Sequence, residues 1–192
     1  MKTFLFRHAQ TTYNLEHRVQ GWTREAVVTD HGREQSLRLA AYFGEEGLDE
    51  LWSSDLLRAV QTAEIMLTVL HGTKHSISEM LREQGQGIFE GRFYDDPEWR
   101  ALQERAERAP EEGETGAAVL ARMRRFFATL AARNLPADAR VGIVSHGGAI
   151  EIFLDDLAGR QGKIPAFKQG DVAEIDCADG RYDLRRIFSI FP

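Results

Sequence analysis

Short apolar runs alternate along this chain with longer stretches of helical periodicity, and this alternation constrains the fold more than any other feature of the sequence. The runs that favour strands are residues 3–6, 51–53, 75–79, 141–145, 172–177 and 182–190. The stretches that favour helices are residues 29–43, 55–70, 95–108, 114–133 and 150–157. Such alternation predicts an α/β fold, a three-layer α/β/α sandwich around a mostly parallel sheet.

Local signals mark where several of these elements begin and end. Thr29 and Asp55 each precede a helical stretch and are typical N-cap residues. Gly147-Gly148 is predicted to form a turn before the helix at 150–157, and Asp179-Gly180 is a hairpin signal between the last two strands. The glycines between Leu81 and Gly91 predict a loop there.

The chain reads as one domain. Its 192 residues suffice for a single substantial core, and 43% hydrophobic with 28% charged residues is ordinary for a globular protein. No linker composition and no internal repeat divides it. We therefore predict a single domain over 1–192, with a small helical cap segment at about 92–113 that ends at Pro110–Gly113.

Charge and cysteine content narrow the partners. A formal net charge of -6 argues against a nonspecific nucleic-acid binder, so positive charge for any anion must be local. The one cysteine, Cys177, can form no internal disulfide, and no Cys or His spacing suggests a metal site. The apolar run at the N-terminus is too short for a signal peptide, and no segment is long enough to span a membrane. A cytoplasmic protein without a membrane or nucleic-acid partner is expected.

Residues that carry chemistry follow the predicted strands. Arg7 and His8 come directly after the first strand, and Arg58 lies just inside the helix after the second. Glu83 follows the third strand, and His146 follows the strand at 141–145. Because ligands of open α/β sheets bind at the carboxyl ends of the strands, these side chains are expected in one crevice.

This set suits phosphoryl transfer. Two guanidinium groups can hold a phosphoryl group by forked hydrogen bonds, and a neutral imidazole can attack phosphorus and split one difficult step into two. A second imidazole can donate to the phosphoryl oxygens, and a carboxylic acid can protonate the leaving oxygen.

The sequence resembles the histidine phosphatase superfamily, the phosphoglycerate-mutase-like proteins. Six blocks carry the resemblance in the family's order, within positions 3 to 157. They are Arg7-His8-Ala9-Gln10-Thr11, then Asn14 with Gln20-Gly21-Trp22, Val28 to Gln35, Ser54 to Ala63, Leu81 to Gly91, and Ser145 to Gly148, with a weaker match at Gly113-Glu114-Thr115.

The resemblance implies a role for each candidate residue. His8 would be the phosphorylated nucleophile, with Arg7, Arg58 and His146 forming the phosphate pocket and Glu83 as proton donor and then base. Asn14, Gln20, Gly21 and the Gly147 amide would contact phosphate or substrate. No metal and no cofactor is implied.

Several positions depart from the family pattern or carry no chemical signal. Ala9 replaces the usual glycine, Gln10 replaces a common glutamate, and Glu151 lies near a position where relatives often carry arginine. If the backbone at position 9 needs a positive φ, Ala9 would force the loop to shift. Arg122, Arg124 and Arg125 are interpreted as a solvated helix face, and Trp22 as a packing residue near the site mouth.

Three functions remain open at this point. The first is a phosphomonoester hydrolase that acts on a small phosphorylated metabolite, resembling broad-specificity and α-ribazole phosphatases. The second is a 2,3-bisphosphoglycerate-dependent phosphoglycerate mutase, although that group is usually longer after the glutamate loop. The third is a non-catalytic protein that binds a phosphorylated ligand. A homodimer is possible under each of them.

Overall fold

The computed structural model describes residues 1–45, 47–104, 109–133, 135–159, 164–178 and 180–191. A six-stranded sheet has the order β3-β2-β4-β1-β5-β6. Its strands are β1 (Lys2–Arg7), β2 (Glu50–Ser53), β3 (Lys74–Ile77), β4 (Arg140–Ser145), β5 (Asp171–Ala178) and β6 (Arg181–Ser189). The four strands from β3 to β1 pair in parallel, whereas β5 pairs antiparallel with both β1 and β6. The predicted mostly parallel sheet is confirmed.

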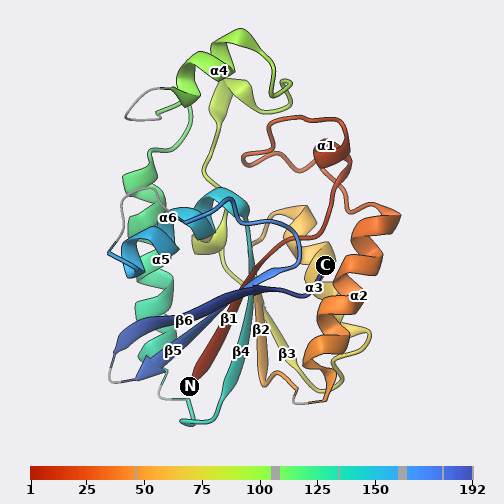
Figure 1. The fold of residues 1–192 in the computed structure, drawn as a ribbon, viewed down its shortest axis with the longest axis vertical. Coiled ribbons are helices and arrows are strands. Elements are labelled where there is room, and N and C mark those ends of the chain that lie inside the picture. The colour runs from red at the N-terminus through yellow and green to blue at the C-terminus, as the bar shows by residue number, and fades with distance from the viewer. Residues whose placement is uncertain (46, 105–108, 134, 160–163, 179, 192) are drawn as a thin grey trace.

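Helices cover both faces of this sheet, as Figure 1 shows. One face carries α2 (Asp30–Gly44) and α3 (Leu57–Leu67), and the other carries α5 (Gly116–Ala131) and α6 (Gly147–Leu157). Each interface encloses its own apolar core, one centred on Phe6 and Phe43 and the other on Phe127 and Phe153. The three-layer α/β/α architecture is therefore confirmed.

Two predicted helix starts need correction. Thr29 caps α2 as expected, because its hydroxyl accepts the Gly32 N–H at 3.0 Å. Asp55, however, is not the N-cap of α3: Leu56 is, and the Asp55 carboxylate instead accepts two hydrogen bonds from the Arg82 guanidinium at 2.7 and 2.5 Å. Such a charge-assisted pair is stronger than a bond to a backbone amide. Gly147 and Gly148 form the first turn of α6 rather than a separate turn.

The loops contain short helices that hydrophobic periodicity does not reveal. They are α1 (Thr12–Leu15) and the 3-10 turns η1 (Glu79–Leu81) and η2 (Gly87–Phe89). The third strand ends at Ile77, two residues before its predicted end. In the predicted cap segment the structure has α4 (Pro97–Gln103), while the last part of the predicted helix, 105–108, lies outside the described residues.

The end of the sheet at which β1 terminates faces α1 and α4 (Figure 1). The single domain over 1–192 and the role of the cap segment at 92–113 stay predictions. Among the described residues, no helix has the length and apolar character needed to cross a membrane.

Candidate active site

Two adjacent parallel strands deliver the two histidines. β1 and β4 run in register, with Arg7 opposite Ser145, and the His8 N–H continues the ladder by donating to the Ser145 carbonyl at 2.9 Å. His8 and His146 therefore leave the sheet side by side, and their ring centroids lie 5.2 Å apart. The sequence argument from strand ends is thus confirmed in its geometry for this pair.

His8 is held as a neutral imidazole with a defined tautomer. Its ring is buried, and Nδ1 lies 2.8 Å from the Ala9 carbonyl oxygen. Because a carbonyl can only accept, Nδ1 carries the proton and Nε2 keeps its lone pair. Burial lowers the pKa of His8 well below its usual value, and the charges of Arg58 and Arg7 lower it further. An uncharged ring with a free lone pair is what a nitrogen nucleophile needs.

Arg58 projects from the first turn of α3 and is only 1% exposed. It donates to the Gly21 carbonyl at 2.7 Å and to the Thr23 carbonyl at 3.3 Å. Burial lowers its pKa to about 10, so the guanidinium remains charged at neutral pH. Neither of these two partners is a carboxylate, and the nearby charges of Glu83 and Glu90 only partly counter the effect of burial on the Arg58 pKa.

Four buried nitrogen atoms lack any hydrogen-bond partner among the described residues. They are Nε of Arg7, Nε of Arg58, and both ring nitrogens of His146. The Arg7 guanidinium has one modest contact, to the Phe167 carbonyl at 3.2 Å. Buried polar atoms are almost always paired in proteins, so an unpaired group of this kind requires an explanation. Three side chains with unpaired nitrogens close to His8 form a cradle for an anion.

His146 is the third side chain with unpaired nitrogen atoms near His8. The residue is fully buried, and burial, followed by the charge of Arg58, lowers its pKa well below the usual value. A neutral imidazole still offers one N–H donor. His146 is also the N-cap residue of α6 but makes no side-chain cap, so its ring is available to a ligand or to a neighbouring side chain.

The carboxylate of Glu83 lies at the N-terminus of α6. It accepts the backbone N–H groups of Gln84 at 2.8 Å, Gly148 at 3.1 Å and Ala149 at 2.9 Å. The amino end of a helix attracts negative charge, which explains why this loop carboxylate settles there. A side chain on Gly148 would collide with it, since an added Cβ would lie 2.8 Å from Glu83 Oε1.

A cavity of about 170 Å³ opens between these groups. Of the predicted site residues, those that line it are Arg7, His8, Gln20, Gly21, Arg58 and Glu83. Gly21 has a φ of +49°, and a Cβ there would lie 2.2 Å from Glu90 Oε1, so only glycine fits where its carbonyl anchors Arg58. The two predicted donors and the nucleophile thus share one small polar cavity.

Three predicted residues lie elsewhere. Asn14 closes a capping box at the start of α1, where its side-chain oxygen accepts the Thr11 N–H at 3.0 Å. Gly147 does not line the cavity, although an added Cβ there would lie 3.4 Å from the Arg7 guanidinium. His146 also lies outside the lining and packs against His8. Substrate contacts by Asn14 and Gly147 stay predictions.

Other residues line the cavity that the sequence argument missed. They are Val19, Gln84, Gln86, Tyr94, Trp99, Gln103 and Gly148. Tyr94, Trp99 and Gln103 come from the predicted cap segment, and burial raises the pKa of the Tyr94 phenol. No spacing rule places these side chains here, because they reach the cavity only through tertiary packing.

The three departures from the family pattern are accommodated locally. Among the described residues other than glycine, only His17 and Glu112 have positive φ, so Ala9 causes no such strain, and its N–H donates to the Thr62 hydroxyl at 3.0 Å. Gln10 accepts a hydrogen bond from the Thr29 hydroxyl at 3.0 Å. Glu151 accepts the Phe167 N–H at 2.7 Å, and burial raises the pKa of Glu151.

The described part of the chain holds no group of three or more His, Cys, Asp or Glu side chains placed to bind a metal ion. Metal independence stays a prediction, to be tested by chelation.

Comparisons with known proteins show the family and the fold. The family model described as "Histidine phosphatase superfamily (branch 1)" matches residues 3–189. A curated relative from Erwinia tasmaniensis, named "Probable phosphoglycerate mutase GpmB", is 30% identical over 95% of this chain and 85% of its own length. A relative of the same name from Escherichia coli is 28% identical over 96% of this chain and 86% of its own.

Solved structures are similar throughout. A mycobacterial glucosyl-3-phosphoglycerate phosphatase in complex with VO3 has a TM-score of 0.84 and 28% identity, covering 95% of this chain and 96% of that one. The α-ribazole phosphatase from Shigella flexneri has a TM-score of 0.83 and 26% identity, covering 99% of this chain and 97% of that one.

Proposed function

This chain belongs to the histidine phosphatase superfamily, branch 1, and on that premise we propose that it is a phosphomonoester hydrolase working through a phosphohistidine at His8. Its substrate is a small phosphorylated metabolite. The observation that carries the proposal is the group of unpaired buried nitrogens on Arg7, Arg58 and His146 around a neutral His8. A phosphoryl group supplies the acceptors that these donors lack.

The first half-reaction uses each of these groups once. The phosphoryl oxygens accept hydrogen bonds from Arg7, Arg58 and His146, which also stabilise the charge that spreads over them in the transition state. The lone pair of His8 Nε2 forms the P–N bond as the ester P–O bond breaks. Glu83, in its protonated form, gives its proton to the leaving oxygen, and the alcohol departs.

The second half-reaction regenerates the enzyme. The Glu83 carboxylate takes a proton from a water molecule whose oxygen attacks phosphorus. The P–N bond breaks, its electron pair returns to His8 Nε2, and inorganic phosphate leaves. Because the Ala9 carbonyl holds Nδ1–H throughout, His8 presents the same nitrogen to phosphorus in every cycle.

The cavity wall beyond the phosphoryl site supports a leaving group without charge. Arg7 and Arg58 are the only guanidinium groups among the described lining residues, and no lysine is among them. The rest of the lining includes four glutamines, the Tyr94 phenol and the Trp99 ring, together with Val19, Gly21, Gly148 and the Glu83 carboxylate. Amides and a phenol hydrogen-bond to hydroxyl groups, and an aromatic ring covers a sugar or polyol face.

We therefore propose a hydroxylated, uncharged leaving group. The cavity, at about 170 Å³, is smaller than the roughly 300–1,000 Å³ of a typical ligand pocket, so it takes the phosphoryl group and only the adjoining part of the substrate. A hexose 6-phosphate should exceed 3-phosphoglycerate in kcat/KM by about tenfold or more, since the described lining offers a carboxylate no cation besides Arg7 and Arg58. A preference for 3-phosphoglycerate would contradict this substrate class.

A phosphoglycerate mutase is the second candidate, favoured by the names of the curated relatives. In a mutase the phosphoryl group of His8 passes to a second hydroxyl instead of to water. Interconversion of 2- and 3-phosphoglycerate without phosphate release, in the presence of 2,3-bisphosphoglycerate, would reverse the order of the two candidates. Release of inorganic phosphate at the same rate as substrate is consumed supports hydrolysis.

The direct test of the proposed function replaces the nucleophile. His8→Ala should lower kcat for p-nitrophenyl phosphate by about 10³-fold or more, because the reaction loses its covalent route. His31→Gln is the matched control, since the His31 side chain is 60% exposed and lies outside the cavity. Wild-type protein quenched with alkali during turnover should carry acid-labile phosphate that His8→Ala lacks. Equal rates in His8→Ala and wild type would remove His8 from the mechanism and leave a binding function.

Chelation tests the predicted metal independence of that reaction. Wild-type activity should persist after dialysis against EDTA, because the proposed steps use only side chains and water. Loss of activity that added divalent metal restores would require a metal in the mechanism.

A further inference from the structure

The proton donor Glu83 lies on a loop that an arginine outside the cavity ties down. Arg122, on α5, is not part of a solvated helix face, as its sequence context suggested: its side chain is only 14% exposed. It donates from Nη1 to the carbonyls of Met80 and Arg82, at 3.0 and 2.5 Å, and from Nη2 to the Glu83 carbonyl at 3.0 Å. One guanidinium thus holds three carbonyl groups of this loop.

Glu114 fixes the orientation of that guanidinium. Its two carboxylate oxygens accept from Nε of Arg122 at 2.9 Å and from Nη2 at 2.8 Å, and its side chain is only 13% exposed. A bidentate pair of this kind sets the plane of the guanidinium as well as its position. The Glu114 backbone also contacts the loop, since its N–H donates to the Gly85 carbonyl at 2.9 Å and its carbonyl accepts from Gln84 Nε2 at 2.6 Å.

The same loop is held from its other side. The Trp22 indole N–H donates to the Glu83 carbonyl at 2.7 Å, so this oxygen accepts from both Trp22 and Arg122. Behind it, the glycine at position 87 has a φ of +52°, and a Cβ there would lie 1.8 Å from the Glu111 carbonyl oxygen. These contacts hold the main chain at Glu83 and place its carboxylate between the cavity and the N–H groups of Gly148 and Ala149.

We infer that Arg122, oriented by Glu114, is a positioning residue for Glu83 and so controls protonation of the leaving group. The inference rests on the proposed function. A proton donor contributes through its distance from the leaving oxygen, and displacement by about 1 Å can cost on the order of 100-fold in rate. Arg122 does not line the cavity, and its described hydrogen bonds reach neither Arg7, Arg58 nor His146. Its charge lowers the pKa of His146, but its direct contacts are with the Glu83 loop, so its loss should act chiefly on the proton transfer.

Two aryl phosphates of nearly the same shape separate this role from a general structural one. p-Nitrophenolate leaves without needing a proton, whereas phenolate needs one. Arg122→Met should lower kcat for phenyl phosphate by about 30-fold and for p-nitrophenyl phosphate by less than about threefold. Arg124→Met is the control on the same helix, because the Arg124 side chain is 60% exposed and pairs only with Asp156 at the surface. It should change neither rate by more than about twofold.

If Arg122→Met does not fold, two conservative variants, Glu114→Gln and Arg122→Lys, test the same inference. Glu114→Gln keeps the volume of the side chain and one acceptor oxygen, and Arg122→Lys keeps the charge but not the fork. Both should show the same selective loss for phenyl phosphate, smaller than that of Arg122→Met, with inhibition by vanadate unchanged. Melting temperature, measured for every variant, establishes that the protein is folded at the assay temperature.

A double variant decides whether Arg122 acts through Glu83. Glu83→Gln alone should show the selective loss in full, and adding Arg122→Met to it should bring no further selective loss. Equal losses on the two substrates, or a second selective loss in the double variant, would overturn the positioning role. Failure of the proposed function is distinct, since wild-type protein would then show no turnover that depends on His8.

Discussion

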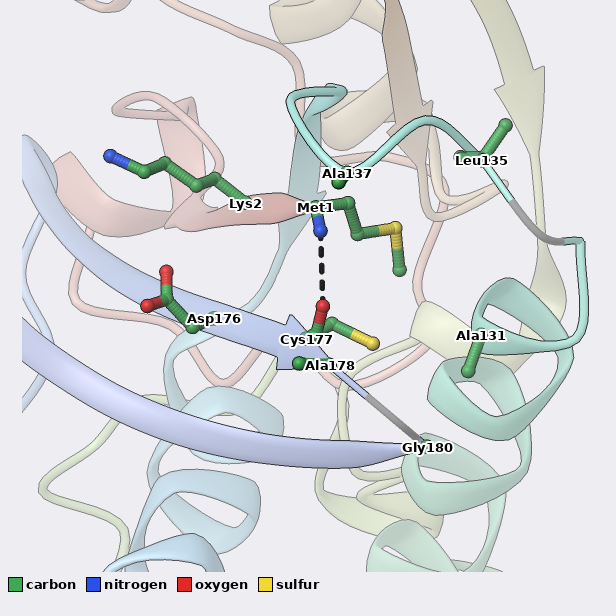
Figure 2. Close-up of a pocket in the computed structure, with 9 residues that line it drawn as sticks. All are labelled: Met1, Lys2, Ala131, Leu135, Ala137, Asp176, Cys177, Ala178 and Gly180. Atoms are coloured by element: carbon green, nitrogen blue, oxygen red, sulfur yellow. Dashed lines mark hydrogen bonds between the residues drawn. The ribbon is translucent and has the colours of Figure 1, made fainter.

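A cavity lies at each end of β1, and the two cavities differ in volume and in the chemistry of their lining residues. The cavity at the amino end is the larger, at about 560 Å³ against about 170 Å³ for the one at the carboxyl end. Figure 2 shows its lining, formed by Met1, Lys2, Ala131, Leu135, Ala137, Asp176, Cys177, Ala178 and Gly180. The smaller cavity contains the two arginines and the histidine nucleophile. The larger cavity therefore lies at one end of the sheet, and the residues suited to catalysis lie at the other.

The difference lies in how the polar groups are paired. At the amino end the N-terminal amine donates to the Cys177 carbonyl at 3.0 Å, Lys2 pairs with Glu174 at 3.5 Å, and Asp176 pairs with Arg185 at 2.5 Å. At the carboxyl end the Nε atoms of Arg7 and Arg58 and both ring nitrogens of His146 have no hydrogen-bond partner among the described residues. An unpaired buried donor costs about 1–3 kcal/mol of desolvation free energy. A ligand that accepts hydrogen bonds in the smaller cavity would recover this cost.

The largest expected effect comes from removing one of the two arginines that line the smaller cavity. Arg58→Met should lower kcat/KM for p-nitrophenyl phosphate by about 10³-fold, since one transition-state donor contributes roughly 10²–10³ and here a full charge is lost as well. Arg185→Met at the amino end, where the arginine already has a partner, should stay within about twofold of wild type. Comparable losses of kcat/KM in the two variants would show that the carboxyl-end cavity is not the specific site of the reaction.

The same pair of variants sharpens the comparison through stability. Inorganic phosphate at about 100 times its Kd should stabilise wild type by about 2.7 kcal/mol, because it binds the folded state alone. Arg58→Met should lose this stabilisation, whereas Arg185→Met should keep it. Without phosphate, Arg58→Met should melt close to wild type, because removal of a buried charge offsets the lost bonds to the Gly21 and Thr23 carbonyls and the lost attraction to Glu83 and Glu90.

A smaller effect is expected when one side chain is enlarged at each end. Gly148→Ala should lower kcat for phenyl phosphate by about tenfold, because the new Cβ would lie 2.8 Å from Glu83 Oε1 and displace the carboxylate. Ala137→Leu adds more volume at the amino-end cavity, and its kcat should stay within about twofold of wild type. Steady-state rates on one substrate measure both. A larger loss in Ala137→Leu would show that the amino-end cavity communicates with the reaction.

The sequence predicted the centre of this arrangement better than its surroundings. Arg7, His8 and Glu83 follow strands, and the rule that strand ends meet at one edge of the sheet is enough to bring them together. Trp99 and Gln103 come from the cap segment, and no local pattern tells which cavity a cap side chain enters.

Polar residues with two possible partners were the hardest to place. Asn14 matches a family contact but closes a capping box with Thr11. Asp55 has the chemistry of an N-cap but pairs with Arg82, which local periodicity cannot foresee. Arg122 lies on the polar side of its helix, and only the packing of the Glu83 loop against α5 buries it.

The smallest effect, and the last contrast between the two ends, appears in the pH dependence of stability. Burial lowers the pKa of both His8 and His146 below the usual value of 6.5, so both rings are neutral in the folded state. Below about pH 6.5 the unfolded chain binds protons that the folded chain does not, and stability falls as pH falls. Above that pH both states are neutral and the stability is retained in full.

Each ring should contribute a slope of roughly 1 kcal/mol per pH unit below pH 6.5. Urea unfolding at pH 7.5, 6.5 and 5.5 measures it, and His146→Gln should remove about half of what His8 and His146 contribute together, leaving the smaller contribution of His75, whose pKa burial also lowers. Cys177→Ala at the amino end should leave the slope unchanged. An unchanged slope in His146→Gln would mean that this ring is protonated in the folded protein, and the anion cradle would then carry a third positive charge.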